Sequence, residues 1–174
     1  ATLEALRFAN AKDGLEIGAR HITVSTCGII RGIERLANEP EQFTLAVSLH
    51  SALQDVRNEI MPRCSNIPLP HLKKALRSYI AKTGRRVSFE YLLIKGVTDT
   101  EENLAALIDF CDGLLCHVNL LSVNEVEGSP YKPSSTATQQ RWVKELKSAG
   151  KEATIRNSRG SDIDGACGQL KNKM

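Results

Sequence analysis

The segment RVSFEYLLIKGVTDTEENLAALIDFCDGLLCHVNLL, residues 86–121, carries the clearest indication of the fold class. It begins and ends with β-rich, largely apolar runs at residues 86–94 and 116–121. Between them, apolar residues recur at helical spacing, at Leu104, Leu107, Ile108 and Cys111. Thr98 and Glu101 are spaced as a capping box at the start of this helix. A strand, a helix and a second strand in this order predict two parallel strands joined by a crossover.

The same alternation continues on both sides of this unit. Further strands are predicted at residues 21–25, 43–49 and 152–156. One predicted helix contains Pro70 in its first turn and ends near Gly84, and another begins after Ser134 or Ser135 and ends at Gly150. The nearly continuous apolar character of several strands is typical of strands covered on both faces. The pattern predicts an α/β fold with a mainly parallel, barrel-like sheet.

Length and composition indicate one folded domain over residues 1–174. Hydrophobic residues make up 41% of the chain and charged residues 25%, which is close to the average for globular proteins. The sequence shows neither a signal-peptide pattern nor an apolar run of about 18 residues, so we expect a cytoplasmic protein without a membrane partner. The net charge of +3 permits an RNA partner without specifying one. The five cysteines form no Cys-x-x-Cys pair, and we expect reduced thiols and no metal site in this chain.

Polar residues stand where the predicted strands end. They are Ser25 after the first strand, Ser48, Leu49 and His50 at the end of the second, Asn124 after the fourth and Asn157 after the fifth. Because ligands bind at the carboxyl ends of parallel strands, we expect these residues to converge on one rim. Structural roles stay open as alternatives. Ser25 or Thr26 can cap the next helix, and backbone groups can satisfy the ring of His50.

A further candidate is Cys167, in the glycine-rich segment of residues 159–170. A cysteine between small residues is accessible and can attack an electrophile, and Arg156 or Arg159 can stabilise its thiolate. The alternatives are an inert loop cysteine and a cysteine hydrolase that pairs Cys167 with His50. Glu90 and Asn119 lie within predicted strands, where either can be structural.

Basic residues gather around one predicted helix and its exit. They are Lys73, Lys74, Arg77, Lys82, Arg85 and Arg86. Such a run is typical of a solvated face, and contact with RNA is the alternative.

The motifs at residues 25–28 (STCG), 48–50 (SLH) and 165–170 (GACGQL), together with Asn124, resemble in order and spacing the RlmN/Cfr family of radical S-adenosylmethionine (SAM) RNA methyltransferases. The resemblance extends over essentially the whole chain. It implies a partial (β/α) TIM-like radical-SAM barrel, truncated at its N-terminus. It further implies that Ser25, Ser48, Leu49, His50 and Asn124 hold SAM, and that Cys167, on a terminal loop at about residues 157–170, becomes methylated.

The resemblance also implies a reaction. The family methylates a ring carbon of adenine in 23S rRNA, and some members also modify tRNA. One SAM methylates the cysteine, a second SAM is cleaved reductively at a [4Fe–4S] cluster, and the resulting radical activates the S-methyl group. We expect methylation at C2 in preference to C8, with an electron donor as a further partner. The alternative is a noncatalytic RNA-binding or scaffold module.

This chain lacks the three-cysteine motif, Cys-x-x-x-Cys-x-x-Cys, that binds the cluster in the family. We therefore expect the cluster only in the full-length parent, and an inactive fragment here. A strand that pairs with residues 21–25 in the family is expected to be missing as well. The exposed sheet edge then predicts self-association, unless an N-terminal helix covers that edge.

Overall fold

A computed structural model describes residues 2–124 and 129–156. Within these ranges five strands form one sheet in the order β1-β2-β3-β4-β5, and every neighbouring pair is parallel. The strands are β1 (Thr23–Thr26), β2 (Thr44–Ser48), β3 (Val87–Leu93), β4 (Cys116–Ser122) and β5 (Glu152–Arg156). All five predicted strands are confirmed, with ends shifted by at most two residues, and so is the α/β fold with a parallel sheet.

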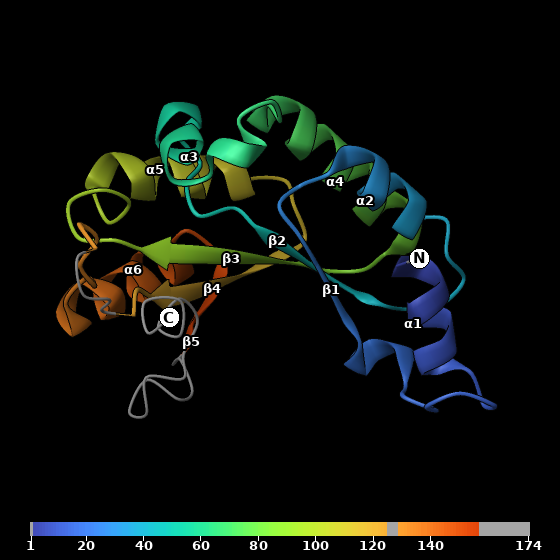
Figure 1. Cartoon of the computed structure of the whole chain (residues 1–174). Coiled ribbons are helices and arrows are strands. Elements are labelled where there is room, and N and C mark those ends of the chain that lie inside the picture. Colours follow the sequence, from blue (N-terminus) through green and yellow to red (C-terminus); the bar gives the residue numbers. More distant parts are fainter. Residues whose placement is uncertain (1, 125–128, 157–174) are drawn as a thin grey trace.

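Helices connect these strands and cover one face of the sheet. They are α1 (Thr2–Asn10), α2 (Ile30–Leu36), α3 (Gln54–Ile60), α4 (Leu69–Thr83), α5 (Glu101–Cys111) and α6 (Thr136–Ser148), with short 3-10 helices η1 (Ala19–His21) and η2 (Pro62–Cys64). Helices α2 to α5 form a layer on one side of β1 to β4, while α1 lies beside the edge strand β1 (Figure 1). The ring of Trp142 in α6 packs against Tyr91 in β3, with ring centroids 5.3 Å apart.

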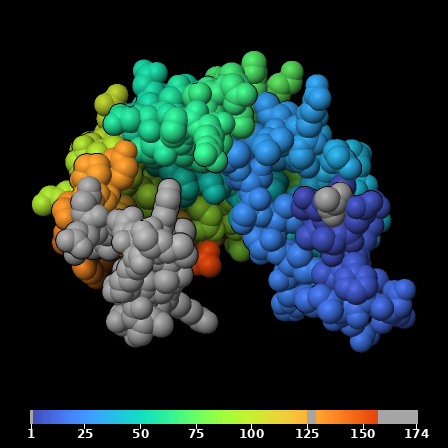
Figure 2. All heavy atoms as spheres, viewed as in Figure 1, coloured from blue at the N-terminus to red at the C-terminus, as the bar shows by residue number. Residues whose placement is uncertain are grey.

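The two faces of the sheet differ, whereas the apolar strands suggested that both faces are covered. In β3, Val87, Phe89, Tyr91 and Leu93 are fully buried, whereas the residues between them are half-exposed. Side chains alternate between the faces of a strand, so the buried set faces the helices. Ser88 and Glu90 face the opposite side, which we call the open face. In Figure 2 atoms of β3 form the floor of a recess below the helical layer.

The first residues of α5 and α6 show which of the predicted helix caps form. The predicted capping box of Thr98 with Glu101 is wrong, because Thr100 caps α5 by accepting a hydrogen bond from the backbone N–H of Asn103. Thr98 is buried instead. Its hydroxyl donates to the carbonyl of Leu92 and accepts from the N–H of Ile94, which closes the loop after β3. The predicted Ser135 cap of α6 is confirmed.

Candidate functional site

A cavity of about 640 Å³ opens on the open face at the carboxyl end of the sheet. All five strands or the loops after them contribute to it. Its polar lining includes Ser25, Ser48, His50, Glu90, Asn124 and Arg156. Four residues that the sequence placed on one rim, namely Ser25, Ser48, His50 and Asn124, therefore share one cavity, as expected for parallel strands joined by crossovers.

His50 is held in an unusual conformation at this rim. Its φ of 57° lies in the left-handed region, and its backbone N–H donates to the carbonyl of Glu90 over 3.2 Å. Burial, assisted by the positive charge of Arg57, lowers the pKa of the imidazole to about 4, so the ring is neutral at pH 7. Its buried Nδ1 has no hydrogen-bond partner within residues 2–124 and 129–156. A ligand in the cavity is a natural partner for a buried polar atom of this kind.

The neighbours of His50 play different parts. Ser48 lines the cavity, but the side chain of Leu49 is fully buried in the hydrophobic core and does not line it. The backbone N–H of Leu49 donates to the carbonyl of Glu90, so Leu49 acts as a positioning residue for the site. After His50, the hydroxyl of Ser51 donates to Asn103 Oδ1 over 2.8 Å and fixes the loop to α5.

Ser25 and Thr26 divide the two roles that the sequence left open. Thr26 Oγ1 accepts hydrogen bonds from the N–H groups of Gly28 and Ile29, so Thr26 stabilises the turn into α2. Ser25 lines the cavity. Its hydroxyl is thus not needed for the turn and is available to a ligand.

A row of polar side chains crosses the open face from β3 to β5. Asn119 Nδ2 donates to Glu90 Oε1 over 2.9 Å, and the hydroxyl of Thr154 donates to Asn119 Oδ1 over 3.2 Å. The row continues to His117, whose Nε2 lies 2.9 Å from the hydroxyl of Thr154. Glu90, Asn119 and Thr154 are paired in register across the three strands, which explains why their side chains meet.

Glu90 is the member of this row that faces the cavity with an unsatisfied atom. Its buried Oε2 has no hydrogen-bond partner in the part of the chain that the structure describes. Arg156 Nη1 lies 3.7 Å away as a looser ionic neighbour. The sequence pattern did not assign Glu90 a functional role. The available signal was a charged residue inside an otherwise apolar strand, on the face opposite its buried neighbours.

The remaining predicted site residues cannot be compared with this cavity. Cys167 and Asn157 lie outside the described residues. Across the described ranges, no group of three or more His, Cys, Asp or Glu residues is arranged to hold a metal ion. The described residues therefore do not fit a [4Fe–4S] cluster, which needs several converging thiolates. They do fit SAM, because hydroxyl, imidazole and carboxylate groups meet in one cavity with unsatisfied atoms.

Comparison with known proteins finds relatives that match almost the whole chain. The chain is 44% identical over 169 residues to a Clostridium novyi protein named "Probable dual-specificity RNA methyltransferase RlmN", which covers 97% of this chain and 49% of the relative. A Clostridioides difficile protein of the same name is 45% identical over 172 residues, or 99% of this chain and 50% of the relative. Over nearly its whole length, the chain is therefore similar to proteins named as RlmN RNA methyltransferases. It spans about half the length of the curated relatives it matches.

Solved structures agree with this similarity. A radical SAM methyltransferase from Sphaerobacter thermophilus matches with a TM-score of 0.92 and 44% identity, over 97% of this chain and 50% of that one. A domain of a pyruvate-formate lyase-activating enzyme from Bacteroides vulgatus matches with a TM-score of 0.61 over 77% of this chain and 80% of that one. At 20% identity, the second match shows the fold alone. No protein-family model matches the chain.

Proposed function

We propose that this chain forms the SAM-binding part of an RNA methyltransferase that acts on a ring carbon of adenine in 23S rRNA. C2 is the preferred position and C8 the alternative, with tRNA as a second substrate. The proposed location is the cytoplasm; no helix in the described ranges is long and apolar enough to cross a membrane. The observation that carries the proposal is the cavity in which Ser25, Ser48, His50 and Asn124 meet the unsatisfied carboxylate oxygen of Glu90.

The chemistry of the cavity suits the polar groups of SAM. SAM has an ammonium group and ribose hydroxyls that donate hydrogen bonds, and a carboxylate that accepts them. Glu90 Oε2 is an acceptor without a hydrogen-bond donor among the described residues, and Ser25 and Ser48 can donate or accept. The neutral ring of His50 can donate or accept through Nδ1 according to its tautomer. When bound, SAM supplies the methyl group and, after reduction, the radical needed to functionalise an unreactive aromatic carbon.

Within this proposal, Cys167 carries the transferred carbon. Its thiolate takes a methyl group from the sulfonium of SAM, which leaves as S-adenosylhomocysteine, and the cysteine becomes a thioether. Support comes from the match of residues 165–170 to the family motif and from the two arginines, Arg156 and Arg159, that precede the cysteine.

Binding of SAM by the 174-residue chain is the direct test, measured by isothermal titration calorimetry. We expect Glu90→Gln to weaken SAM binding by about tenfold, because the amide places an NH₂ group where the ligand needs an acceptor. Glu59→Gln removes an exposed carboxylate from α3 and should leave the affinity unchanged. Absence of SAM binding by the unaltered chain would contradict the proposal. RNA binding without SAM affinity would favour a noncatalytic module.

The substrate and the carrier cysteine are tested in the natural full-length protein. Peptide mass spectrometry of protein purified from cells should find a methyl group on the Cys167 peptide. Cys167→Ala should abolish methylation of 23S rRNA, whereas Cys111→Ala, on a buried helix face, should retain activity. Nuclease digestion followed by chromatography against 2-methyl- and 8-methyladenosine standards assigns the ring carbon. A methyl group on another cysteine would contradict the role of Cys167.

We further propose that the 174-residue chain alone does not cleave SAM. The described residues contain no group of three or more side chains arranged to hold a metal ion, and the proposed reaction needs an electron donor as well. Anaerobic incubation with iron and sulfide should leave no stable visible absorption and no 5′-deoxyadenosine after reduction. Appearance of that product would contradict this part of the proposal.

A last element of the proposal is self-association at β1, one of the two edge strands of the described sheet. Large apolar side chains are exposed in and around this region, namely Phe8, Leu15, Ile17 and Ile29. An exposed edge with such neighbours favours association with a second copy.

A further inference from the structure

A second, basic cleft lies at the opposite end of the sheet from the proposed SAM cavity. It has a volume of about 430 Å³ and sits at the amino ends of β2 and β3. Its lining comprises Arg20, Gln42, Phe43, Thr44, Thr83, Gly84, Arg85, Arg86 and Ser88. Three arginines therefore line a cleft whose lining contains no acidic residue.

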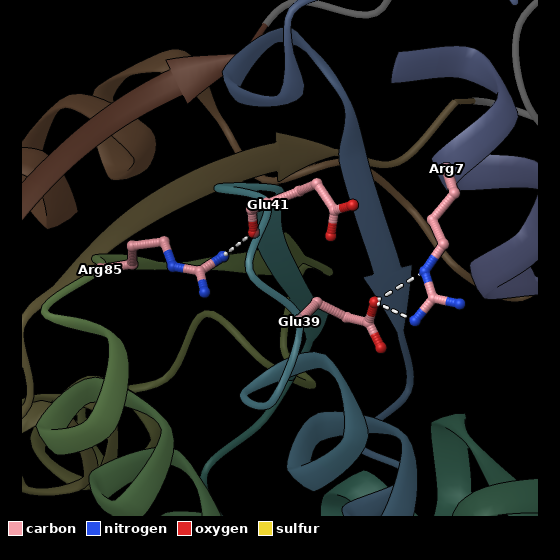
Figure 3. Close-up of polar contacts among 4 residues, drawn as sticks. All are labelled: Arg7, Glu39, Glu41 and Arg85. Atoms are coloured by element: carbon pink, nitrogen blue, oxygen red, sulfur yellow. Dashed lines mark hydrogen bonds and ion pairs between the residues drawn. The ribbon is translucent and has the colours of Figure 1, made fainter. Parts of the chain in front are cut away.

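Two of these guanidinium groups are held in place by the fold. Arg85 Nη1 donates to the backbone carbonyls of Glu41 and Phe43 over 3.0 and 3.1 Å, and the first of these bonds is drawn in Figure 3. The same guanidinium lies over the ring of Tyr79, 5.5 Å from its centroid. Arg20 Nε donates to Gln42 Oε1 over 2.7 Å. Fixed guanidinium groups lose little conformational entropy when they bind a ligand.

The charge of the cleft is not neutralised by the acidic residues around it. Glu39 pairs with Arg7 on α1, and the carboxylate of Glu41 points away from Arg85 (Figure 3). Arg86 makes no hydrogen bond or ion pair within the described ranges. Its charge acts, with that of Glu152, on the nearby ring of His117. Planar guanidinium groups that lack carboxylate partners are suited to the oxygens of a phosphate group.

The structure also divides the basic run that the sequence placed around α4. Lys73 donates to the carbonyl of Asp109, and Lys82 pairs with Asn38. Lys74 and Arg77 lie exposed on α4 and do not line the cleft. From that run, only Arg85 and Arg86 reach the cleft, where Arg20 joins them from η1. Three arginines from two distant segments thus form a shaped site, while the rest of the run is a solvated face.

We propose that this cleft binds a backbone phosphate of the RNA substrate. The shared chemistry is that of a phosphate oxyanion, and the choice of RNA as its source rests on the proposed function. Thr44 in the cleft and Ser48 in the cavity lie on the same strand, four residues and about 13 Å apart. One RNA molecule can therefore occupy both ends of the open face, with sequence-independent anchoring at the cleft.

The experiment measures binding of a fluorescently labelled single-stranded RNA to the 174-residue chain by anisotropy, over a range of salt concentrations. The Arg20→Gln/Arg86→Gln double variant removes two cleft charges and spares the more deeply anchored Arg85. Lys74→Gln/Arg77→Gln removes the same charge from the exposed face of α4 and is the matched control. Circular dichroism melting checks that all forms fold. SAM titration of the same samples reports separately on the cavity.

We expect the cleft variant to bind RNA about tenfold more weakly and to reduce the slope of log K against log salt by about 1.4, as for the loss of two phosphate contacts to a single strand. The control should change neither quantity, and SAM binding should stay the same in all forms. Inorganic phosphate should displace RNA from the unaltered chain more effectively than chloride at equal ionic strength.

Equal losses in the two double variants would overturn the proposal, because they would show an effect of net charge alone. Phosphate binding that depends on the cleft while RNA binding does not would overturn the assignment to RNA. Cleft-dependent RNA binding by a chain that binds no SAM would leave this inference standing and would instead contradict the proposed function.

Discussion

At the scale of single residues, His50 shows how the fold prepares a neutral polar group for a ligand. The left-handed backbone turns the chain sharply after β2, and the two hydrogen bonds to the carbonyl of Glu90 hold that turn. Histidine tolerates this conformation better than most residues that have a Cβ atom. The turn places the ring in a buried position near Arg57, where protonation is unfavourable. The ring therefore stays uncharged, and its Nδ1 has no hydrogen-bond partner among the described residues.

Stability should consequently depend on pH through His50. Because the folded-state pKa of about 4 lies below the ordinary 6.5, the unfolded chain binds more protons between these values. The contribution is complete above pH 6.5 and is lost as the pH falls toward 4, by up to about 3 kcal/mol. His50→Asn, which also accepts a positive φ, should flatten this part of the profile. Urea unfolding at several pH values measures the stability of the variant and of the unaltered chain. The same pH dependence in both would contradict the assignment to His50.

Arg57 links the segments that flank the proposed site. It is fully buried, and its Nη2 donates to the carbonyl of Cys27 over 2.6 Å, while Nη1 lies 3.5 Å from the carbonyl of Cys64. Arg57→Lys keeps the charge but cannot bond both carbonyls in the same geometry. We expect a loss of about 2 to 4 kcal/mol in the free energy of unfolding, measured with urea. The exposed Arg63→Lys serves as control, and equal stabilities would refute the linking role.

At the scale of elements, the start of α5 separates a helix cap from a loop anchor. Thr98→Val would leave the N–H of Ile94 and the carbonyl of Leu92 without their buried partner, at a cost of about 1 to 3 kcal/mol. Thr100→Ala removes the cap and should cost about 1 kcal/mol. Chemical denaturation of both variants should show the larger loss for Thr98→Val. The opposite order would show that the Thr98 anchor contributes less to stability than the Thr100 cap.

The elements also show what the sequence can and cannot reveal. Strand and helix periodicity predicted β3, α5 and β4 closely, because local apolar spacing determines them. The same reasoning misassigned Thr98, since a Thr–Glu spacing does not reveal that a loop will bury the threonine. It also left Glu90 and Asn119 without a role. Glu90 and Asn119 lie 29 residues apart in sequence, and their side chains meet only because the two strands are paired in this register.

The candidate site was likewise predicted only in part. The convergence of Ser25, Ser48, His50 and Asn124 followed from the carboxyl-end rule for parallel strands. Leu49 lies next to them in sequence, but alternation turns its side chain into the core. The basic cleft could not be predicted from the run around α4 alone, because Arg20 comes from another segment and only the sheet brings it beside Arg86.

At the scale of the whole molecule, helices cover one face of the sheet and leave the other face open. One face is buried under helices, while the open face carries a cavity at one end and a basic cleft at the other. The two sites share strands β2 and β3 but no lining residue. Changes in one should therefore leave the other intact, which is the reason for measuring SAM and RNA binding on the same variants.

The edge of the sheet at β1 is the region where we expect the chain to associate with a second copy. Helix α1 covers part of this edge, since Leu3 and Leu6 pack partly against the core, and an apolar groove of about 370 Å³ remains between α1, β1 and α2. Ile29 lines that groove and is 57% exposed, and Phe8 on α1 is 60% exposed. Burial of such side chains against a second copy is worth about 1.5 kcal/mol or more each.

We therefore expect the isolated chain to dimerise at micromolar concentration, and Phe8→Lys/Ile29→Lys to shift it toward the monomer. The shift should correspond to at least a tenfold weaker dimer, because a lysine ammonium would have to be buried or displaced. Leu115→Lys changes a side chain that is also largely exposed but lies before β4, away from this edge, and should leave dimerisation unchanged. Sedimentation equilibrium measures all three forms. A monomeric unaltered chain would show that α1 is sufficient to protect the edge, and an equal effect of Leu115→Lys would place the contact elsewhere.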